Sequence, residues 1–487
     1  MLPPFPTAGD FNPWHNEGLI PDGQLKVNGE FQGVNLAIIG TGYVGLTTGA
    51  ALAYLGSRVT CLDVDQEKLT LLRAGKAPIF EPHLEDLLSL AAENLVFTAD
   101  YAEAVADADV VFIAVGTPSL PDGSPNLQYL RAAAESVSEH LGERFTVIIN
   151  KSTVPIGSGN WVEAMLREGY EKRNSKQAAP PFAVASNPEF LREGSALHDT
   201  LYPDRIVVGS DHARALEILY QLYKPIVEQT FAAPTFLPRP EGLAAVPLIT
   251  ADLASAELIK YAANAFLALK ISYVNEIGQL AEKVGADILQ VARGIGLDSR
   301  IGTRFLQAGI GWGGSCFGKD TAALIATANE YGLSMPIVKA SREMNTVQRG
   351  RVVEKLFGEL KILKGKTVGL LGLAFKPNTD DLRDAPALDI AQRLLERGAR
   401  VRAHDPVALD RARREHSHLP VALCDSAAQA SAGADALVLV TEWPEYRDLD
   451  WEGLCVAMRT PLVLDGRNFL DRERLQKAGF LYIGFGR

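Results

Sequence analysis

The sequence predicts an α/β protein with two doubly wound, Rossmann-like domains joined by a central helical region that contains a long helix. Three observations support this fold class: apolar runs that alternate with helical stretches, a long proline-free stretch in the middle of the chain, and a weaker copy of the first pattern near the end. We expect an irregular leader over residues 1–33, a first domain over 34–245, the central region over 246–350 and a second domain over 351–487.

Composition excludes several classes of protein. The 487 residues are 47% hydrophobic and 22% charged, with a net charge of −11 and a pI near 5.4, so nucleic acid and anionic membranes are not expected partners. No apolar run reaches the ~18 residues of a membrane span. The scattered cysteines form no CxxC pair, which favours a reducing cytoplasmic location and argues against disulfides or a metal site. They are Cys61, Cys316, Cys424 and Cys455.

The first domain opens with strand and helix signals in alternation. Residues 34–39 are an apolar run typical of a buried parallel strand, and the alanine-rich helix that follows ends at Gly56. Further apolar strands are expected over 58–63, 108–118 and 145–153. Their alternation with helical stretches predicts a doubly wound parallel sheet.

A GxGxxG motif stands between the first strand and the first helix. Gly40 permits the tight turn, Gly42 lets the backbone approach a pyrophosphate, and Gly45 lets the helix pack closely on the strand. Asp63 ends the second strand, where a carboxylate binds the ribose hydroxyls of NAD and repels the 2′-phosphate of NADP. The motif therefore predicts an NAD site, with a glycine turn of some other α/β protein as the alternative.

The middle and the end of the chain supply the remaining elements. Residues 252–285 contain no proline and predict the long helix, on which Lys260 and Asn264 share one face. The pair alone is also compatible with a solvated helix face. Strand, glycine turn, helix and strand then recur from residue 367 onwards, which predicts the second doubly wound domain.

The segment GWGGSCFGKD, residues 311–320, is the strongest candidate for chemistry. If Cys316 begins a helix, the helix N-terminus favours its thiolate, and Asp320 lies one turn later on the same side. The preceding glycines would leave room for a ligand. We interpret Cys316 as a nucleophile rather than a structural thiol, and Glu189 and Glu193 as further candidates on a loop after a strand.

These segments together resemble the nucleotide-sugar 6-dehydrogenases of the UDP-glucose/GDP-mannose dehydrogenase family. The stretches that carry the resemblance, in order, are GTGYVG, VGTPS, KSTVP, NPEFLREG, ELIKYAANAF, GWGGSCFGKD, LAFKPNTDDLRDAP and DGRN. The RIG and GWGGSCF stretches resemble members that act on UDP-glucose more than those that act on GDP-mannose or UDP-N-acetylmannosamine. The resemblance implies a twofold oxidation of the sugar C6 by NAD in a homodimer or larger homo-oligomer.

The resemblance also implies roles for individual residues. Cys316 would form a thiohemiacetal and then a thioester, and Lys260 and Asn264 would hold the C6 oxygen. Asp320, Thr153 and Glu189 would handle protons and the hydrolytic water. Cofactor positions would be Gly40, Gly42, Tyr43, Val44, Gly45, Asp63, Lys68, Thr117, Thr153 and Glu193. Substrate positions would be Glu189, Phe190, Leu191, Arg192, Glu193, Lys260, Asn264, Arg300, Gly313 and Lys376, with Arg300 reaching a neighbouring subunit. No metal is expected.

Two other hypotheses remain at this point. Tyr220 and Lys224 form a YxxxK pair, which is typical of short-chain epimerases and reductases but leaves the cysteine segment unexplained. A catalytically inactive nucleotide-sugar sensor is the second, and the joint presence of Cys316, Lys260 and Asp320 argues against it.

Overall fold

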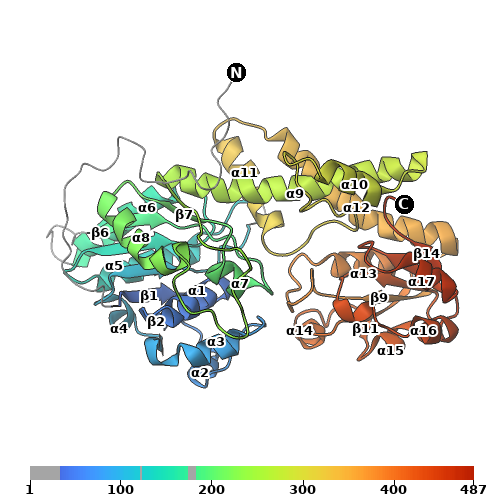
Figure 1. Ribbon diagram of the computed structural model, residues 1–487, viewed down its shortest axis with the longest axis horizontal. Coiled ribbons are helices and arrows are strands. Elements are labelled where there is room, and N and C mark those ends of the chain that lie inside the picture. Colours follow the sequence, from blue (N-terminus) through green and yellow to red (C-terminus); the bar gives the residue numbers. More distant parts are fainter. Residues whose placement is uncertain (1–32, 121–122, 174–181) are drawn as a thin grey trace. The chain divides into compact units, whose positions relative to one another are not determined.

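The computed structural model describes residues 33–120, 123–173 and 182–487 (Figure 1). The expected leader therefore lies, apart from its last residue, outside the described part of the chain. The chain forms two compact units. The first ends at Lys260 and the second takes in everything from Tyr261 onwards, together with the short segments Phe80–Pro82 and Pro118–Asn126.

The first unit is built on an eight-stranded sheet with the order β3-β2-β1-β4-β5-β6-β7-β8. Its neighbours pair in parallel except at Ser186 and Gly209, where β6 meets β7 antiparallel. The strand order reverses beside β1, and in such sheets ligands bind outside the carboxyl ends of the strands at that point. The strands are β1 (Asn35–Ile39), β2 (Arg58–Leu62), β3 (Leu95–Thr98), β4 (Val110–Ile113), β5 (Thr146–Asn150), β6 (Phe182–Ser186), β7 (Ile206–Gly209) and β8 (Leu248–Ala251).

Helices cover both faces of this sheet because successive side chains of each buried strand point to opposite faces. Leu36 and Ile38 of β1 belong to one core cluster, with residues of α1 and α8, whereas Ala37 and Ile39 belong to another, with residues of α4, α5 and α6. The helices are α1 (Tyr43–Tyr54), α2 (Gln66–Arg73), α3 (Leu84–Leu90), α4 (Tyr101–Val105), α5 (Gln128–His140), α6 (Ser158–Arg173), α7 (Ala196–Leu201) and α8 (Ala213–Val227).

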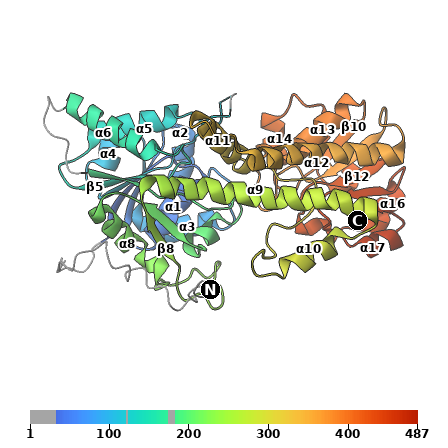
Figure 2. The same cartoon turned by 90° about the horizontal axis from the view of Figure 1, so that it is seen from above.

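A central helical region follows. Its longest member is α9 (Leu253–Val284), the long yellow-green helix in Figure 2. α10 (Ile288–Gly296), α11 (Phe317–Glu330) and α12 (Pro336–Leu360) complete it, and α11 packs against α12. The long helix predicted over 252–285 is confirmed to within one residue at each end.

The second sheet repeats the arrangement of the first with six strands in the order β11-β10-β9-β12-β13-β14, all paired in parallel. α13 packs on β10, α15 on β9 and β10, and α17 on β14. The strands are β9 (Thr367–Leu371), β10 (Arg400–His404), β11 (Val421–Leu423), β12 (Ala436–Leu439), β13 (Leu462–Asp465) and β14 (Leu481–Ile483). The helices are α13 (Pro386–Glu396), α14 (Leu409–Glu415), α15 (Ala427–Ser431), α16 (Trp451–Ala457) and α17 (Arg472–Lys477).

The predicted fold class is confirmed: two Rossmann-like parallel sheets and a helical region with a long helix. The sequence analysis did not identify the short strands β3, β7, β8, β11 and β14. Within the described residues, no helix combines the length and the apolar character needed to cross a membrane.

Candidate active site

The glycine turn after β1 has the geometry that the motif predicts. Gly40 has a φ of +101°, and a Cβ there would lie 2.7 Å from the Ala114 carbonyl oxygen. A Cβ on Gly45 would lie 1.9 Å from the Gly40 carbonyl oxygen, so the helix can pack this closely only without a side chain. A Cβ on Gly42 would meet no described atom within 4 Å. The N-terminus of α1 is therefore open to an anion, as a pyrophosphate requires.

Asp63 is fixed beside this turn at the end of β2. Its Oδ2 accepts from Thr41 N at 2.9 Å and Thr41 Oγ1 at 2.6 Å, and its Oδ1 accepts from Asp65 N at 3.0 Å. Lys68 Nζ lies 3.7 Å from Oδ2. Burial opposes ionisation of Asp63, but these hydrogen bonds and the Lys68 charge outweigh it and lower the pKa of the carboxyl. The group is therefore a preoriented anion that keeps acceptor capacity on both oxygens.

The other expected cofactor positions lie at the same edge of the sheet. Tyr43 and Val44 are the first two residues of α1, and Lys68 is in α2. Thr117 Oγ1 donates to the Thr153 carbonyl oxygen at 2.8 Å, which joins the segments that follow β4 and β5. These residues come together at the carboxyl ends of parallel strands, where a dinucleotide binds in this fold.

A buried ion pair lies after β6. Lys260 Nζ of α9 is 2.7 Å from Glu189 Oε1 and 2.5 Å from the Glu189 carbonyl oxygen, and Leu191 N donates to Glu189 Oε2 at 2.8 Å. Only 4% of Lys260 and 8% of Glu189 is exposed. Burial opposes ionisation of Glu189, yet the Lys260 ammonium, with the hydrogen bond from Leu191 N and the charge of Lys151, outweighs this effect and lowers the pKa of the carboxyl.

Basic side chains also contact or belong to the rest of the 189–193 loop. The Phe190 ring lies 5.5 Å from Lys260 Nζ and 3.7 Å from Arg205 Cζ. The Arg192 guanidinium donates two hydrogen bonds, of 2.6 and 2.9 Å, to the Asp199 carboxylate, and Arg192 N donates to the same carboxylate at 2.8 Å. These contacts fix the conformation of the loop at Arg192. Arg205 was not among the expected site residues, and no sequence motif pointed to its contact with Phe190.

Cys316 is the N-cap of the fourteen-residue helix α11, as the sequence analysis supposed. Asp320 N donates to the Cys316 carbonyl oxygen at 2.8 Å, so Asp320 begins the next turn. Cys316 is half-buried, and its Sγ lies 3.7 Å from Ser315 Oγ. A thiolate here gains from the helix N-terminus and from partial access to a reactant.

Asp320 is buried beside α9. Asn264 Nδ2 donates to Asp320 Oδ2 at 2.6 Å, and Lys319 Nζ lies 3.9 Å from Oδ1. Only 1% of Asp320 is exposed. Since Asn264 and Lys260 are one turn apart on α9, this helix supports both the Glu189 pair and the Asp320 contact.

The glycines before Cys316 have a structural reason in addition to the one expected. A Cβ on Gly313 would lie 2.5 Å from the Asp384 carbonyl oxygen, and one on Gly314 would lie 2.6 Å from the Phe375 ring. Gly311, with φ +93°, would bring a Cβ to 2.2 Å from Asn345 Oδ1. Contacts within the protein are therefore sufficient to require these glycines, and the interpretation that they also leave room for a ligand stays a prediction.

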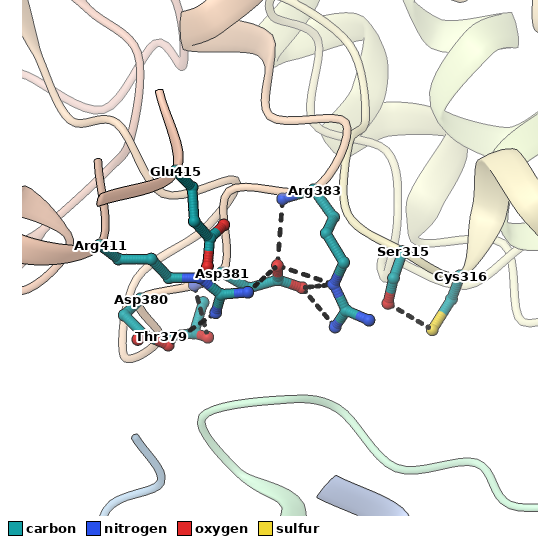
Figure 3. A network of polar contacts seen from close by, with 8 residues as sticks. All are labelled: Ser315, Cys316, Thr379, Asp380, Asp381, Arg383, Arg411 and Glu415. Atoms are coloured by element: carbon teal, nitrogen blue, oxygen red, sulfur yellow. Dashed lines mark hydrogen bonds and ion pairs between the residues drawn. The ribbon is translucent and has the colours of Figure 1, made fainter. Parts of the chain in front are cut away.

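Arg383 is a charged residue of this region that the sequence analysis missed. Its guanidinium binds the buried carboxylate of Asp381 through Nε at 2.9 Å and Nη2 at 2.7 Å. Arg411 lies 3.8 Å from the same carboxylate. Figure 3 shows Arg383 between Asp381 on one side and Ser315 and Cys316 on the other. The DLRDAP stretch was quoted for resemblance only, although its charges indicated such an anchored arginine.

Other candidates are placed as follows. Arg300 has 87% of its side chain exposed and pairs with Asp298 at 2.6 Å. Lys376 Nζ lies 5.3 Å from the Phe375 ring. Tyr220 and Lys224 of α8 both approach Glu228, the C-cap of that helix, at 3.5 and 4.0 Å, so the YxxxK pair is part of a helix-surface cluster rather than a site.

Cys61 and Cys424 are poor nucleophiles. Burial raises the pKa of Cys61 in β2 to about 12, and burial also raises the pKa of Cys424. Cys455 lies in α16. Within the described ranges, no group of three or more His, Cys, Asp or Glu side chains is arranged to hold a metal ion.

Three family models match the chain in order. They are the NAD binding domain (residues 34–227), the central domain (254–347) and the UDP binding domain (369–472) of the UDP-glucose/GDP-mannose dehydrogenase family. The UDP-glucose 6-dehydrogenase TuaD of Bacillus subtilis is 44% identical over 93% of this chain and 93% of its own length. The UDP-glucose 6-dehydrogenase of Pseudomonas aeruginosa is 46% identical over 93% of this chain and 98% of its own. The chain belongs to the UDP-glucose/GDP-mannose dehydrogenase family.

Solved structures agree with this membership. A UDP-glucose dehydrogenase from Pyrobaculum islandicum matches with a TM-score of 0.82 and 39% identity, covering 96% of this chain and 99% of its own. A UDP-D-ManNAc dehydrogenase from Pyrococcus horikoshii matches with a TM-score of 0.78 and 26% identity, covering 93% and 99%. The predicted family, the dehydrogenase class and the NAD-binding domain are confirmed.

Proposed function

We propose that this protein oxidises UDP-glucose to UDP-glucuronate at C6, with two NAD+ reduced per sugar. The activity for which the two bacterial relatives are named supports UDP-glucose as the substrate, because four-tenths or more of the aligned residues are identical over nearly the full length of both proteins. NAD+ supplies the hydride acceptor for each oxidation.

The reaction balances through a covalent intermediate on Cys316. The C6 alcohol first loses a hydride and a proton and becomes an aldehyde. The Cys316 thiolate adds to that carbonyl carbon and forms a thiohemiacetal, which loses a second hydride and a proton to become a thioester. Water then displaces the thiol and releases the carboxylate. The aldehyde stays attached to the enzyme during the second oxidation.

The other side chains act on charge and protons. Lys260 and Asn264 hold the C6 oxygen, and the Lys260 ammonium stabilises the oxyanions that develop there. Asp320, with Thr153 and Glu189, accepts protons and orients the hydrolytic water. The expected cofactor and sugar-nucleotide positions keep the roles given by resemblance, including the approach of Arg300 to a neighbouring subunit.

The observation that carries this proposal is the position of Cys316. It is the N-cap of α11, one turn before buried Asp320, and Asn264 of α9 fixes that carboxylate at 2.6 Å. A structural thiol needs neither a helix N-terminus nor a buried carboxylate. The same arrangement argues against an inactive sensor.

A related sugar nucleotide is the alternative substrate, because the 26% identical structural neighbour is named for UDP-D-ManNAc. NAD+ reduction should be measured with UDP-glucose, UDP-galactose, GDP-mannose and UDP-N-acetylmannosamine. We expect the highest kcat/KM with UDP-glucose and two NADH per sugar consumed. A higher kcat/KM with another sugar nucleotide would show that UDP-glucose is not the preferred substrate. Formation of only one NADH per sugar would show that the second oxidation does not occur.

Assembly and location are further parts of this proposal. We expect a homodimer or larger homo-oligomer in the reducing cytoplasm. Sedimentation at several protein concentrations tests the assembly.

A further inference from the structure

Arg342 of α12 contacts the turn of α11 that directly follows Cys316. Its Nη1 donates to the Gly318 carbonyl oxygen at 2.5 Å and to Thr321 Oγ1 at 2.6 Å. Thr321 is fully buried, and its hydroxyl in turn donates to the Phe317 carbonyl oxygen at 2.6 Å. A guanidinium stays protonated in proteins, so these contacts place a fixed positive charge against the first turn of α11. The reaction scheme gives Arg342 no role.

The first turn of α11 contains a glycine. Gly318 is the second residue of this helix, and glycine has more backbone freedom to lose on entering a helix than any other residue. The hydrogen bond from Arg342 to the Gly318 carbonyl oxygen therefore restrains the peptide of this turn that is intrinsically the most flexible. That peptide lies only two residues after the proposed nucleophile.

The peptide group between Gly318 and Lys319 also transmits the charge of Arg342 along the helix axis. In an α-helix each carbonyl points towards the C-terminus and each N–H towards the N-terminus, so the N–H of this peptide faces the helix end at which Cys316 lies. The side chain of an N-cap residue ordinarily accepts from the N–H of the second or third helical residue. A cation at the carbonyl oxygen polarises the peptide and makes its N–H a stronger donor. Arg342 therefore strengthens the positive end of α11 on the side of Cys316.

Attachment of α12 to the segment that precedes Cys316 does not require Arg342. Trp312 N donates to Asn345 Oδ1 at 2.8 Å, and Asn345 Nδ2 donates to the Trp312 carbonyl oxygen at 2.9 Å. Arg349 Nη2 donates to the same carbonyl oxygen at 2.9 Å. These contacts fix the segment before the nucleophile, whereas Arg342 contacts the turn after it.

We propose that Arg342 is a positioning residue for the Cys316 nucleophile: its guanidinium fixes and polarises the first turn of α11, so that the thiolate of Cys316 is stabilised. The inference rests on the proposed function, in which Cys316 reacts as a thiolate. Lys319 and Asp320 on α11, and Arg383 in Figure 3, are further charged groups near Cys316. They are unchanged in the variants below, so their effects cancel in the comparison.

The rate at which iodoacetamide alkylates Cys316 tests the inference without any need for turnover, because only the thiolate reacts. The modified peptide that contains position 316 should be quantified by mass spectrometry from about pH 6 to about pH 10, which separates Cys316 from the other cysteines. Arg342→Met should lower the rate at neutral pH by about three- to fivefold, the size of a charge interaction at a helix end. The rates should converge at alkaline pH, where the thiol is ionised in both proteins.

Two further substitutions of Arg342 separate its charge from its size. Arg342→Lys keeps a cation within reach of the Gly318 carbonyl oxygen and should restore most of the alkylation rate and of kcat. Arg342→Gln keeps a donor without a charge and should react as slowly as the Met variant at neutral pH. In both neutral variants kcat should fall with little change in the KM for UDP-glucose. A wild-type alkylation rate in the Gln variant, or a rise in KM without a fall in kcat, would overturn the inference.

Arg351→Met is the matched control. Arg351 also lies in α12, but its Nη2 donates to Glu282 Oε2 of α9 at 2.6 Å. Its loss removes an ion pair from the same helix and should leave the alkylation curve of Cys316 unchanged. Equal losses in the two Met variants would make Arg342 a general structural residue, and a loss of the same size at every pH would mean altered access to the thiol. Either result would overturn the inference, whereas absence of wild-type turnover with UDP-glucose would contradict the proposed function.

Discussion

Substitutions in the buried pair of Lys260 and Glu189 should affect unfolding free energy and turnover differently. Lys260→Met removes the cation that lies 2.7 Å from the Glu189 carboxylate, which stays buried and keeps the hydrogen bond from Leu191 N. Removing one partner of such a pair typically costs about 3–5 kcal/mol of unfolding free energy, because the remaining buried charge loses the ion in contact with it. Adding Glu189→Gln removes that charge, and the double variant should regain most of the loss.

The assay is a double-mutant cycle. Urea unfolding of wild type, Lys260→Met, Glu189→Gln and the double variant gives four unfolding free energies at one pH, and their combination gives the coupling free energy between the two side chains. We expect a coupling free energy of roughly 2–4 kcal/mol, somewhat below the typical cost of breaking a buried ion pair. Turnover should be lost in the Met variant and should stay lost in the double variant, because the oxyanion still lacks its cation.

A matched cycle on Arg167 and Glu163 controls for general effects of charge removal. These side chains pair on α6 at 2.8 Å but are 55% and 37% exposed, so solvent should reduce their coupling to a small value. Additive losses at Lys260 and Glu189, or a coupling no larger than in this control, would refute the reasoning. Recovery of turnover in the double variant would refute the electrostatic role of Lys260.

Three further results are expected. NAD+ should be strongly preferred over NADP+, because the ionised Asp63 repels a 2′-phosphate; equal initial rates with both cofactors would reject this role. The pKa of Glu189 is lower in the folded protein than in the unfolded chain, where it is near 4.5. The ionised carboxylate therefore stabilises the fold above about pH 4.5, and this stability is lost as the pH falls through the folded pKa. The Tm of wild type should accordingly decrease in acid more than that of the Lys260→Met/Glu189→Gln variant. Gly314→Ala should lower the Tm because its Cβ would lie 2.6 Å from Phe375 at a φ of +86°, whereas Gly332→Ala, with positive φ but open space, should lower it less.

Features of the chain that depend on local geometry could be predicted from the sequence. The glycine turn, Asp63 at the end of β2, α9, and Cys316 at the start of α11 each follow from residue spacing within one or two turns. Strands such as β3 and β8 could not be predicted, because their residues are partly exposed at or near the sheet edges and lack a continuous apolar run.

Long-range partners were outside the reach of the sequence pattern. Glu189 and Lys260 are 71 positions apart, and Asn264 and Asp320 are 56 apart. The sequence placed Lys260 and Asn264 on one helix face but could not assign a different carboxylate to each. The role of Gly313 was also hidden, because the carbonyl oxygen that excludes a side chain there belongs to Asp384, far along the chain.

The covalent role of Cys316 is the central claim, and the intact-protein mass of Cys316→Ser after incubation with UDP-glucose and NAD+ tests it most directly. A hydroxyl at this position can still be acylated but releases the acid very slowly, since an alkoxide leaves less readily than a thiolate. We therefore expect a sugar-nucleotide adduct on the peptide that contains position 316, and no adduct with Cys316→Ala. An unmodified Cys316→Ser protein that forms UDP-glucuronate at the wild-type rate would contradict the account.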